Sequence, residues 1–411
     1  MANPVQHRDW ISKIRLQRAM AALTFVALLG PSLVASVSAE AQTFTVLHNF
    51  TGAPDGALSE SGLVRDKAGT LYGTTLGGGD SSCNSPNGCG VVFKVEADGD
   101  ETVLHSFTGG SDGAYPQAGL VRDTMGNLYG TAEEGGASGD GTVFEISPRG
   151  KETVLYAFMG GAADGCYPFG GLVRDKVGNL YGTTNECGST GYGTVFRISH
   201  KNGKETVLHS FTGSDGAYPY LTSLILDGKG NLFGVAVGGG NSMCGGNGCG
   251  TVYELSRSGK FTVLYTFTGG TSDGCGPSGI PTIDTDGNLY GTTSNCGSSG
   301  YGTTWKLNKS GKETVLHSFA GAPSDGSYPL AGVIRDAKGN LYGDTSEDGA
   351  SDDGTVYELS EKGALTLLHS FVAADGAGPF GDLTRDTAGR FYSTSSGGGS
   401  GNYGTVFKLT P

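Results

Sequence analysis

After residue 42 the chain has no stretch in which apolar residues recur at helical spacing over the length of a helix. Familiar catalytic motifs are missing too: there is no HExxH, no phosphate-binding glycine loop and no clear Ser-His-Asp set. Two G-x-S-x-G matches, at 109–113 and 270–274, lie on no strand-to-helix turn, and 75 glycines make chance matches common. These absences predict an all-β chain and leave it without a recognisable reaction.

Positive charge is scarce, with 27 Lys and Arg against 40 Asp and Glu, or a net charge of −13. Without residues 1–41 the balance is 23 against 38, or −15. An acidic surface disfavours nucleic acid and anionic lipid, and permits cations, neutral glycans or basic partners. Simple solubility explains the charge as well. The charge therefore predicts that nucleic acid is not a partner. We also expect an extracellular glycan or protein as partner, and a monomer.

Seven copies of one motif run along the chain, and each contains an Asp-Gly step. Successive steps are 57, 52, 51, 58, 52 and 50 residues apart. A period near 50 with only β-type patterning is typical of a four-stranded propeller blade. A β-solenoid is the alternative, but its repeats are usually shorter and it needs terminal caps, which the sequence does not show. The aspartates of the seven steps are Asp55, Asp112, Asp164, Asp215, Asp273, Asp325 and Asp375.

Residues 103–153 show the pattern of one repeat. The segments VLHSF, AGLVRD, LYGTA and GTVFEIS alternate apolar and polar residues and are bounded by Gly, Asp, Asn or Pro. The D-x-x-G-N sequence between two of them is typical of a hairpin, since Gly and Asn accept positive φ. The last repeat ends at 405–409 without its own VLHSF-like strand, whereas 43–50 supply a surplus one. The sequence thus predicts a seven-bladed β-propeller with four-stranded blades, closed by pairing of the N- and C-terminal strands.

The repeat resembles the GloVer tandem-repeat family of secreted bacterial proteins. The residues that carry the resemblance are LHSFTGGSDGAYP (104–116), GNLYGT (126–131) and GTVFEIS (141–147), with their counterparts in the other repeats. The resemblance covers essentially all of 43–411. It implies export and a β-propeller-like fold, and it implies no activity, cofactor or site residue.

The N-terminus has the pattern of a secretory signal. Four basic residues precede an apolar run over 19–37, and small residues near Ala39 and Ala41 offer cleavage sites. An uncleaved membrane anchor is the alternative, but Gly30 and Pro31 inside the run argue against a stable spanning helix. We expect a signal peptide over 1–41, a propeller over 42–411 without a transmembrane segment, and a secreted or periplasmic location.

Eight cysteines fall into four local groups. An even number in an exported chain favours disulfides. In a propeller, the loop that enters a blade's inner strand and the loop between its second and third strands lie on one face, which brings together the cysteines that are 21 residues apart. Zinc is the alternative, but the spacing fits no common site and no paired His is present. The predicted pairs are Cys83–Cys89, Cys166–Cys187, Cys244–Cys249 and Cys275–Cys296.

The face with the long, disulfide-bearing loops is the candidate binding face, because binding residues concentrate on long loops of a rigid scaffold. Residues present in every repeat are expected to be structural. The Asp-Gly aspartates should cap their loops, although a ring of carboxylates could also hold calcium or a cationic ligand. The arginines of the LVRD segments should form ion pairs: Arg65, Arg122, Arg174, Arg335 and Arg385. The histidines that alternate with Tyr156 and Tyr265 should pack rather than bind metal: His48, His105, His209, His317 and His369.

Departures from the repeat are more informative about a ligand, which need not have sevenfold symmetry. Leu226 replaces an arginine, Phe233 replaces a tyrosine, and Trp305 stands where other repeats have Phe or Tyr. Aromatic rings beside Asp would suit a sugar, since a ring face stacks while hydroxyls hydrogen-bond. Drift between the repeats is the alternative explanation. The ligand-binding candidates are Tyr115, Tyr167, Tyr218, Tyr220, Tyr328, Asp215 and Asp273.

The leading hypothesis is a secreted propeller that binds an extracellular glycan or protein, with no cofactor except possible calcium and no metal ligands that the sequence identifies. The alternatives are a polysaccharide hydrolase or lyase that uses acidic loop residues, and a structural surface module. A deep axial funnel with convergent carboxylates would favour an enzyme. A shallow aromatic shelf would favour glycan binding, and a flat polar face would favour the structural hypothesis.

Overall fold

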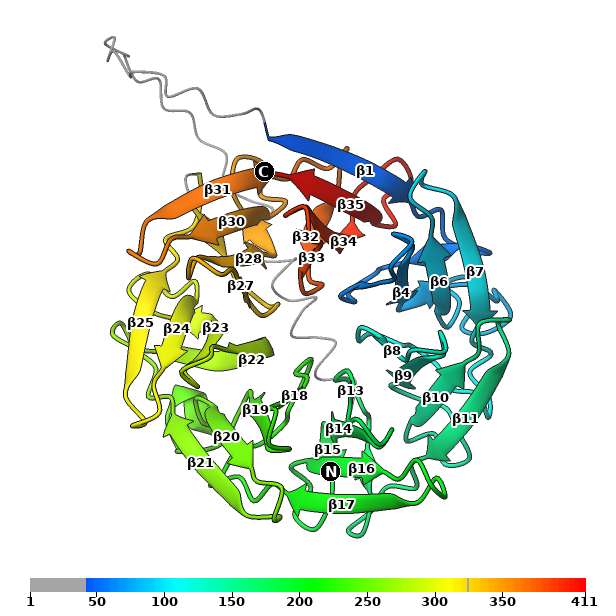
Figure 1. Ribbon diagram of the computed structural model, residues 1–411, viewed down its shortest axis with the longest axis horizontal. Coiled ribbons are helices and arrows are strands. Elements are labelled where there is room, and N and C mark those ends of the chain that lie inside the picture. Colours follow the sequence, from blue (N-terminus) through cyan, green and yellow to red (C-terminus); the bar gives the residue numbers. More distant parts are fainter. Residues whose placement is uncertain (1–41, 324) are drawn as a thin grey trace. The chain divides into compact units, whose positions relative to one another are not determined.

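Seven antiparallel sheets surround a central axis and confirm the predicted seven-bladed propeller (Figure 1). The computed structural model describes residues 42–323 and 325–411, so the predicted signal peptide over 1–41 lies outside the described residues. Six sheets have four strands, and the seventh gains a fifth because β32 (Ala377–Pro379) also pairs with β34 (Phe391–Gly397). The only helix in the described ranges is the short 3-10 turn η1 (Cys244–Gly246).

The two inner strands of each blade follow the V-R-D and L-Y-G-T segments of the repeat. The innermost strands are β3 (Val64–Arg65), β8 (Val121–Arg122), β13 (Val173–Arg174), β18 (Ile225–Leu226), β22 (Gly274–Ile283), β27 (Ile334–Arg335) and β33 (Thr384–Arg385). The second strands are β4 (Leu71–Thr75), β9 (Leu128–Ala132), β14 (Leu180–Thr184), β19 (Leu232–Ala236), β23 (Leu289–Cys296), β28 (Leu341–Thr345) and β34.

The two outer strands follow the G-T-V-F and V-L-H-S segments. The third strands are β6 (Val91–Val95), β10 (Thr142–Ile146), β16 (Thr194–Ile198), β20 (Thr251–Leu255), β24 (Thr303–Leu307), β30 (Thr355–Leu359) and β35 (Thr405–Thr410). The outermost strands are β1 (Thr43–Asn49), β7 (Glu101–Ser106), β11 (Glu152–Ala157), β17 (Glu205–Ser210), β21 (Phe261–Thr266), β25 (Glu313–Ser318) and β31 (Leu365–Ser370).

The ring closes between the two ends of the repeat domain, as predicted. Strand β1 pairs antiparallel with β35, from Thr43 opposite Thr410 to Asn49 opposite Thr405. Blade seven therefore takes its outermost strand from the start of the chain and its three inner strands from the end (Figure 1). The pairing leaves no blade incomplete, which removes the open edge that would otherwise promote aggregation.

The hydrophobic core lies between neighbouring blades. One cluster joins Val92 of blade one to Phe107 and Phe144 of blade two, and each of the other interfaces has a similar cluster. Phe107 and Phe144 meet edge to face with ring centroids 5.1 Å apart, and every blade has such an aromatic pair. The glycine of L-Y-G-T leaves room for this ring, because a Cβ on Gly130 would lie 2.6 Å from the tip of Phe144.

The hairpins between the first and second strands are built around a repeated aspartate. In blade six, one carboxylate oxygen of Asp336 accepts the N–H groups of Lys338 and Asn340, each at 2.9 Å. The other oxygen accepts the Asn340 amide and the Tyr342 hydroxyl, each at 3.2 Å. Although burial opposes ionisation, these hydrogen bonds lower the pKa of Asp336. Equivalent aspartates organise all seven hairpins: Asp66, Asp123, Asp175, Asp227, Asp284, Asp336 and Asp386.

The LVRD arginines contact the preceding blade in a way that the sequence prediction mostly missed. The guanidinium of Arg385 lies 5.2 Å from the ring centroid of Tyr342, and the other four arginines lie over a tyrosine of the preceding blade in the same way. Within the described ranges, only Arg122 also forms the predicted ion pair, at 3.8 Å from Asp66. The other four arginines stack on the tyrosine without an ion pair to a hairpin aspartate.

Candidate functional site: the long-loop face and its axial pocket

Two sets of loops meet at one end of the propeller and form the face that we call the long-loop face. The segments that enter the innermost strands, loops except for the start of β22 and a few short strands, cover 50–63, 107–120, 158–172, 211–224, 267–280, 319–333 and 371–383. The loops between second and third strands cover 76–90, 133–141, 185–193, 237–250, 294–302, 346–354 and 396–404. Short strand pairs join the two sets, such as β12 (Gly165–Cys166) with β15 (Glu186–Cys187) and β26 (Gly326–Ser327) with β29 (Glu347–Asp348). In blade one the same pairing joins β2 (Gly56–Ala57) to β5 (Gly77–Gly78).

Charge is divided unequally between this face and the rest of the propeller. The fourteen loops contain eighteen Asp and Glu and no Lys or Arg. Every Lys and Arg after residue 42 therefore lies in the strands or in the short turns at the opposite end, the short-turn face. The sequence prediction noted the overall acidity and missed this division, which mapping the basic residues onto the predicted loops would have found. Such a face attracts cations and repels anions.

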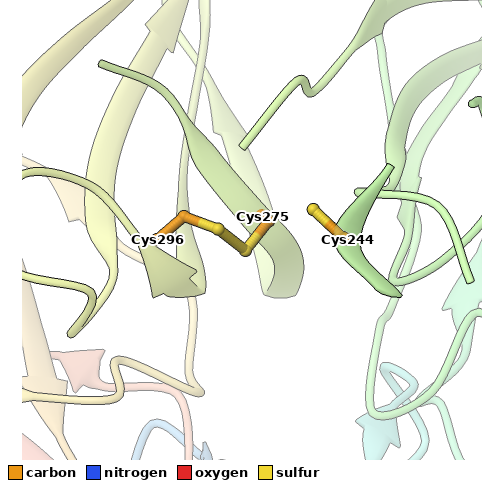
Figure 2. A group of neighbouring side chains, drawn as sticks. All are labelled: Cys244, Cys275 and Cys296. Atoms are coloured by element: carbon orange, nitrogen blue, oxygen red, sulfur yellow. A yellow bond between two sulfur atoms is a disulfide. The ribbon is translucent and has the colours of Figure 1, made fainter. Parts of the chain in front are cut away.

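All four predicted disulfides are present. Cys166–Cys187 and Cys275–Cys296 each join an entering loop to the loop between second and third strands, and Cys83–Cys89 and Cys244–Cys249 close insertions within a loop. The sulfur of Cys244 lies near the Cys275–Cys296 bond of the neighbouring blade (Figure 2), with the three sulfurs within 4.8 Å of one another. All three are oxidised, and the described residues contain no free cysteine, so this group offers no thiolate for a metal.

Tyr115, Tyr167, Tyr218 and Tyr328 occupy equivalent, half-buried positions, one in each of four entering loops. Their backbones are left-handed, with φ between 54° and 58°, and the equivalent Leu58, Gly276 and Gly378 have φ of 57°, 65° and 59°. At each position the N–H donates to a carbonyl in the preceding blade, as from Tyr218 to Tyr192 at 3.0 Å. The glycines at 276 and 378 are thus explained by backbone conformation, since glycine adopts positive φ without strain. The hydrogen bonds at all seven positions join neighbouring blades. A ligand role for the four tyrosines stays a prediction.

The predicted ligand residues Asp215 and Asp273 lie inside their own loops. Asp273 is buried and accepts hydrogen bonds from the Tyr265 hydroxyl at 3.0 Å and from the N–H groups of Thr268 and Gly274, each at 2.7 Å. Asp215 accepts the Thr212 N–H at 2.8 Å and lies 3.1 Å from the His209 ring nitrogen. All seven Asp-Gly aspartates lie within 3.3 Å of a His nitrogen or a Tyr hydroxyl. Each also accepts a backbone N–H of its own loop, which is the expected capping role. The aligned histidines therefore hold a loop in addition to packing.

A carboxylate from the next blade approaches this contact at four of the seven blade interfaces. Glu101 lies close to His48 and Asp55: one carboxylate oxygen of Glu101, one of Asp55 and a ring nitrogen of His48 all lie within 4.8 Å of one another. At two other interfaces a phenylalanine stacks on the histidine instead, as Phe261 does on His209 at 3.6 Å. The replacement of glutamate by phenylalanine favours a packing role for this position. Burial first, and a neighbouring aspartate second, raise the pKa of Glu101, Glu205 and Glu313 to about 7.

A pocket lies on the propeller axis, where all seven blades contribute residues. Its cavity volume is about 30 Å³, and the space between its walls together with the open solvent at its mouth is about 390 Å³. Phe169, Leu221, Leu330 and Phe380 supply apolar walls, and several glycines, such as Gly279, bring the backbone close to the space. The predicted Tyr220 stands beside this pocket, with its ring centroid 4.7 Å from that of Phe169. None of the other predicted ligand residues contributes to the lining.

The polar groups of the pocket come mainly from three adjacent blades. Glu60 of blade one and Asp382 of blade seven both line it, as does Gln117 of blade two, whose amide donates to Glu133 at 2.7 Å. One oxygen of Asp382 accepts the Gly332 N–H at 2.7 Å. Burial raises the pKa of Asp382. The pocket thus combines aromatic rings with hydrogen-bonding carboxyl and amide groups, and its lining contains no Lys or Arg among the described residues.

A second carboxyl group is buried behind Asp382. Asp344 on β28 is 1% exposed, and neither of its oxygens has a hydrogen-bond partner. Burial, and then the nearby charge of Asp382, raise its pKa well above the usual range. The sequence carries a signal for this residue, since blade six reads L-Y-G-D-T where most others read L-Y-G-T-T or L-Y-G-T-A, but the sequence prediction did not include Asp344.

The fold and site define a seven-bladed propeller with an acidic loop face and a small axial pocket. The sequence matches the Gloeobacter/Verrucomicrobia repeat over residues 30–246 and 222–411, so the chain belongs to this repeat family. No curated protein matches the chain. No helix in the described part of the chain is long and apolar enough to cross a membrane, and the four disulfides indicate an extracytoplasmic location.

Solved structures with the same fold include several propellers of different function. A streptogramin B lyase structure has a TM-score of 0.56 and 12% identity, covering 90% of this chain and 97% of that one. The extracellular domain of a hybrid two-component system from B. thetaiotaomicron has a TM-score of 0.53 and 13% identity, covering 90% and 41%. An oligogalacturonate lyase from Vibrio parahaemolyticus has a TM-score of 0.53 and 10% identity, covering 89% and 93%. At these identities the likeness shows the fold alone.

Proposed function

We propose that the protein is an exported binding module that takes an extracellular glycan in the axial pocket of its long-loop face. The observation that carries this proposal is the lining of the pocket, where Phe169 and Phe380 stand with Glu60, Gln117 and Asp382. A sugar presents an apolar ring face and several hydroxyl groups, which matches aromatic rings beside carboxyl and amide groups. The seven blades give the pocket seven different walls, so a ligand without sevenfold symmetry can be recognised.

The remaining expectations fit this proposal. Export agrees with the four disulfides and with the signal-like N-terminus. The acidic long-loop face disfavours nucleic acid and anionic lipid as partners. We propose a monomer that needs no cofactor, with calcium as the one ion worth testing because of the carboxylates on this face. An extracellular protein is the alternative partner.

The test is binding of the purified protein to a panel of polysaccharides and oligosaccharides, with and without calcium, followed by calorimetry on each hit. Phe380→Ala and Tyr220→Ala should each weaken a hit about tenfold, because each removes an aromatic ring at or beside the pocket. Tyr403→Ala is the matched control, since Tyr403 is an exposed aromatic residue of the same face that does not line the pocket. An absence of glycan binding, or equal losses in all three variants, would contradict the proposal.

A polysaccharide hydrolase or lyase is the second candidate, and a specific observation favours it. Two carboxyl groups, Glu60 and Asp382, converge on one pocket, and burial raises the pKa of Asp382, as a general acid requires. Release of products from a bound oligosaccharide, lost in Asp382→Asn and Glu60→Gln, would establish this function. Binding without product release would leave the binding module.

A further inference from the structure

Two disulfides from neighbouring blades approach each other on the long-loop face. Cys244–Cys249 closes the insertion of blade four, and Cys275–Cys296 joins two loops of blade five. The Cys244 sulfur and both blade-five sulfurs lie within 4.8 Å of one another (Figure 2). A Cβ on Gly269 would lie 2.8 Å from the Cys244 sulfur and 3.3 Å from the Cys296 sulfur, so the glycine leaves the space in which the two bonds approach.

Blades one and two contain the same arrangement without the second disulfide. Cys83–Cys89 closes the equivalent insertion of blade one, and a Cβ on Gly109 of blade two would lie 2.5 Å from the Cys83 sulfur. Blade two has Ala114 and Gly135 at the positions where blade five has its two cysteines. Among the described residues, only the interface of blades four and five therefore places one disulfide against another.

Cys244 is the accessible residue of these two bonds. It is exposed, whereas the other three cysteines are buried or half-buried. Gly245 and Gly246 follow it, and a Cβ on either would have no atom within 4 Å beyond its chain neighbours, so the tip of the insertion has open space around it. The Gly276 N–H donates to the Cys249 carbonyl at 3.0 Å, which holds the base of the insertion against blade five. An external thiol can thus reach Cys244 while the blade-five bond stays behind it.

We propose that this interface is a thiol–disulfide exchange site, which takes a low-molecular-weight thiol as co-reactant and forms a new disulfide between blades four and five. The thiolate of the co-reactant attacks the Cys244 sulfur, and Cys249 leaves as a thiolate that takes up a proton. A second thiolate attacks the co-reactant's sulfur in this mixed disulfide, which forms the disulfide of the co-reactant and releases the Cys244 thiolate. The Cys244 thiolate then attacks one sulfur of Cys275–Cys296, and the other sulfur leaves and takes up a proton.

The balance of these steps defines the product. Two co-reactant thiols are oxidised to one disulfide, one disulfide of the protein is reduced, and the last step exchanges one protein disulfide for another. The product joins the insertion to blade five and leaves two free thiols, one of them on Cys249. None of the four cysteines lines the axial pocket, so this inference is independent of the ligand that the pocket takes. Attack requires the thiolate, so the rate should increase about tenfold from about pH 6.5 to about pH 7.5.

The first experiment uses Cys249→Ser, which leaves Cys244 as a free thiol and makes the co-reactant unnecessary. Trypsin should release 230–257, which contains Cys244, and 261–306, which contains both blade-five cysteines, as separate segments unless a disulfide joins them. Free thiols are alkylated in acid, and the digest is measured by mass spectrometry without reduction. The two segments should be joined, and one cysteine of 261–306 should be alkylated.

Cys89→Ser is the matched control, because it removes the equally buried cysteine of the blade-one insertion and frees Cys83 where no second disulfide lies. Its bonds between blades should be at least about tenfold rarer than in Cys249→Ser. An alkylated Cys244 beside an intact blade-five disulfide in Cys249→Ser would overturn the inference. Equal bonding between blades in both variants would also overturn it, since exchange would then come from unfolding.

The parent protein keeps the test decisive if Cys249→Ser folds poorly. Reduced glutathione, in about twofold molar excess, should join 230–257 to 261–306 in the parent protein, and Cys244→Ser should show no such product. Reduction of Cys244–Cys249 by glutathione with both segments still separate would overturn the exchange. Joined segments in Cys249→Ser, but none in the treated parent protein, would overturn the assignment of a low-molecular-weight thiol as co-reactant.

Discussion

The long-loop face and the short-turn face are built from the same seven repeats, but the repeats are alike on the short-turn face and differ from one another on the long-loop face. On the short-turn face every blade has the same hairpin around an aspartate such as Asp336, and the chain places many of its basic residues there. On the long-loop face the loops differ in length, contain all four disulfides and have no basic residue. The comparison separates positions that maintain the scaffold from positions that are free to form a site.

Uniformity across blades is the mark of the scaffold on both faces. The Asp-Gly aspartates belong to the long-loop face, but all seven contact a His or Tyr, and their contacts hold the loops in place. Several single-blade departures lie at or near the axis, where Asp344, Asp382 and Glu60 each occur in one blade. Substitutions on the two faces should therefore change different quantities, stability on one and ligand affinity on the other.

The largest effect is expected on the short-turn face. Asp336→Ala removes the acceptor of four hydrogen bonds and should lower the free energy of unfolding by about 2–3 kcal/mol without changing ligand affinity. Urea unfolding and calorimetry with the bound ligand measure the two quantities. Asp98→Ala is the control on the same face, because Asp98 is exposed and accepts one hydrogen bond of 3.4 Å, and it should change stability by less than about 0.5 kcal/mol. Equal losses would remove the distinction between the two aspartates.

The second-largest effect is expected for Asp344→Thr, which tests whether the buried carboxyl group near the axial pocket reduces stability. Asp344→Thr should raise the free energy of unfolding by about 1–2 kcal/mol at pH 7, because it replaces a buried carboxyl group with the hydroxyl group that other blades use. The folded state holds the proton of Asp344 more tightly than the unfolded state does, so the parent protein loses stability as the pH rises above about 4 and the gain should grow over that range.

Thr292→Asp in blade five makes the reverse change and is the matched control. It should lower the free energy of unfolding by about 2 kcal/mol or more, since it removes the hydrogen bond to Ala331 and buries a carboxyl group. Loss of stability in Asp344→Thr would show that Asp344 belongs to the scaffold, and the contrast between the faces would then fail at the axis.

The sequence was sufficient to predict the fold because each repeat contains the strand pattern and the turn residues of one complete blade. The period, the turn residues of segments such as 123–127 and the surplus strand at 43–50 predicted seven blades and their closure, and the structure has both. The two disulfides between cysteines 21 residues apart followed from the topology, since both loops joined by Cys166–Cys187 had to emerge on one face. These features depend on short sequence patterns and on the number and order of the repeats, and a single sequence shows both.

The site was harder to predict from the sequence because it is assembled from single positions in seven separate loops. Tyr115 and its equivalents were prominent in the sequence because they recur, but their recurrence is tied to a left-handed backbone that also accepts the glycine at 276. The pocket residues follow two or more positions later and differ in each blade, as Glu60, Phe169 and Phe380 do. Nothing in a period or a motif identifies such positions before the loops are placed around one axis.

The smallest effect is expected at the outer rim, which belongs to neither face. Burial, and then Asp273, raise the pKa of Glu313 to about 7 from an ordinary value of 4.5, so the folded state binds its proton more tightly than the unfolded state does. Stability contributed by the neutral form is therefore lost as the pH rises from about 4.5 to 7.

Glu313→Gln should raise the free energy of unfolding at pH 7.5 by about 1 kcal/mol, should have little effect at pH 4, and should leave ligand affinity unchanged. Thermal unfolding across this range measures the difference, with Glu361→Gln in an exposed turn as the charge-matched control. The same gain at both pH values would show that the ionisation of Glu313 is not its cause, and a change in ligand affinity would extend the functional region from the long-loop face to the rim.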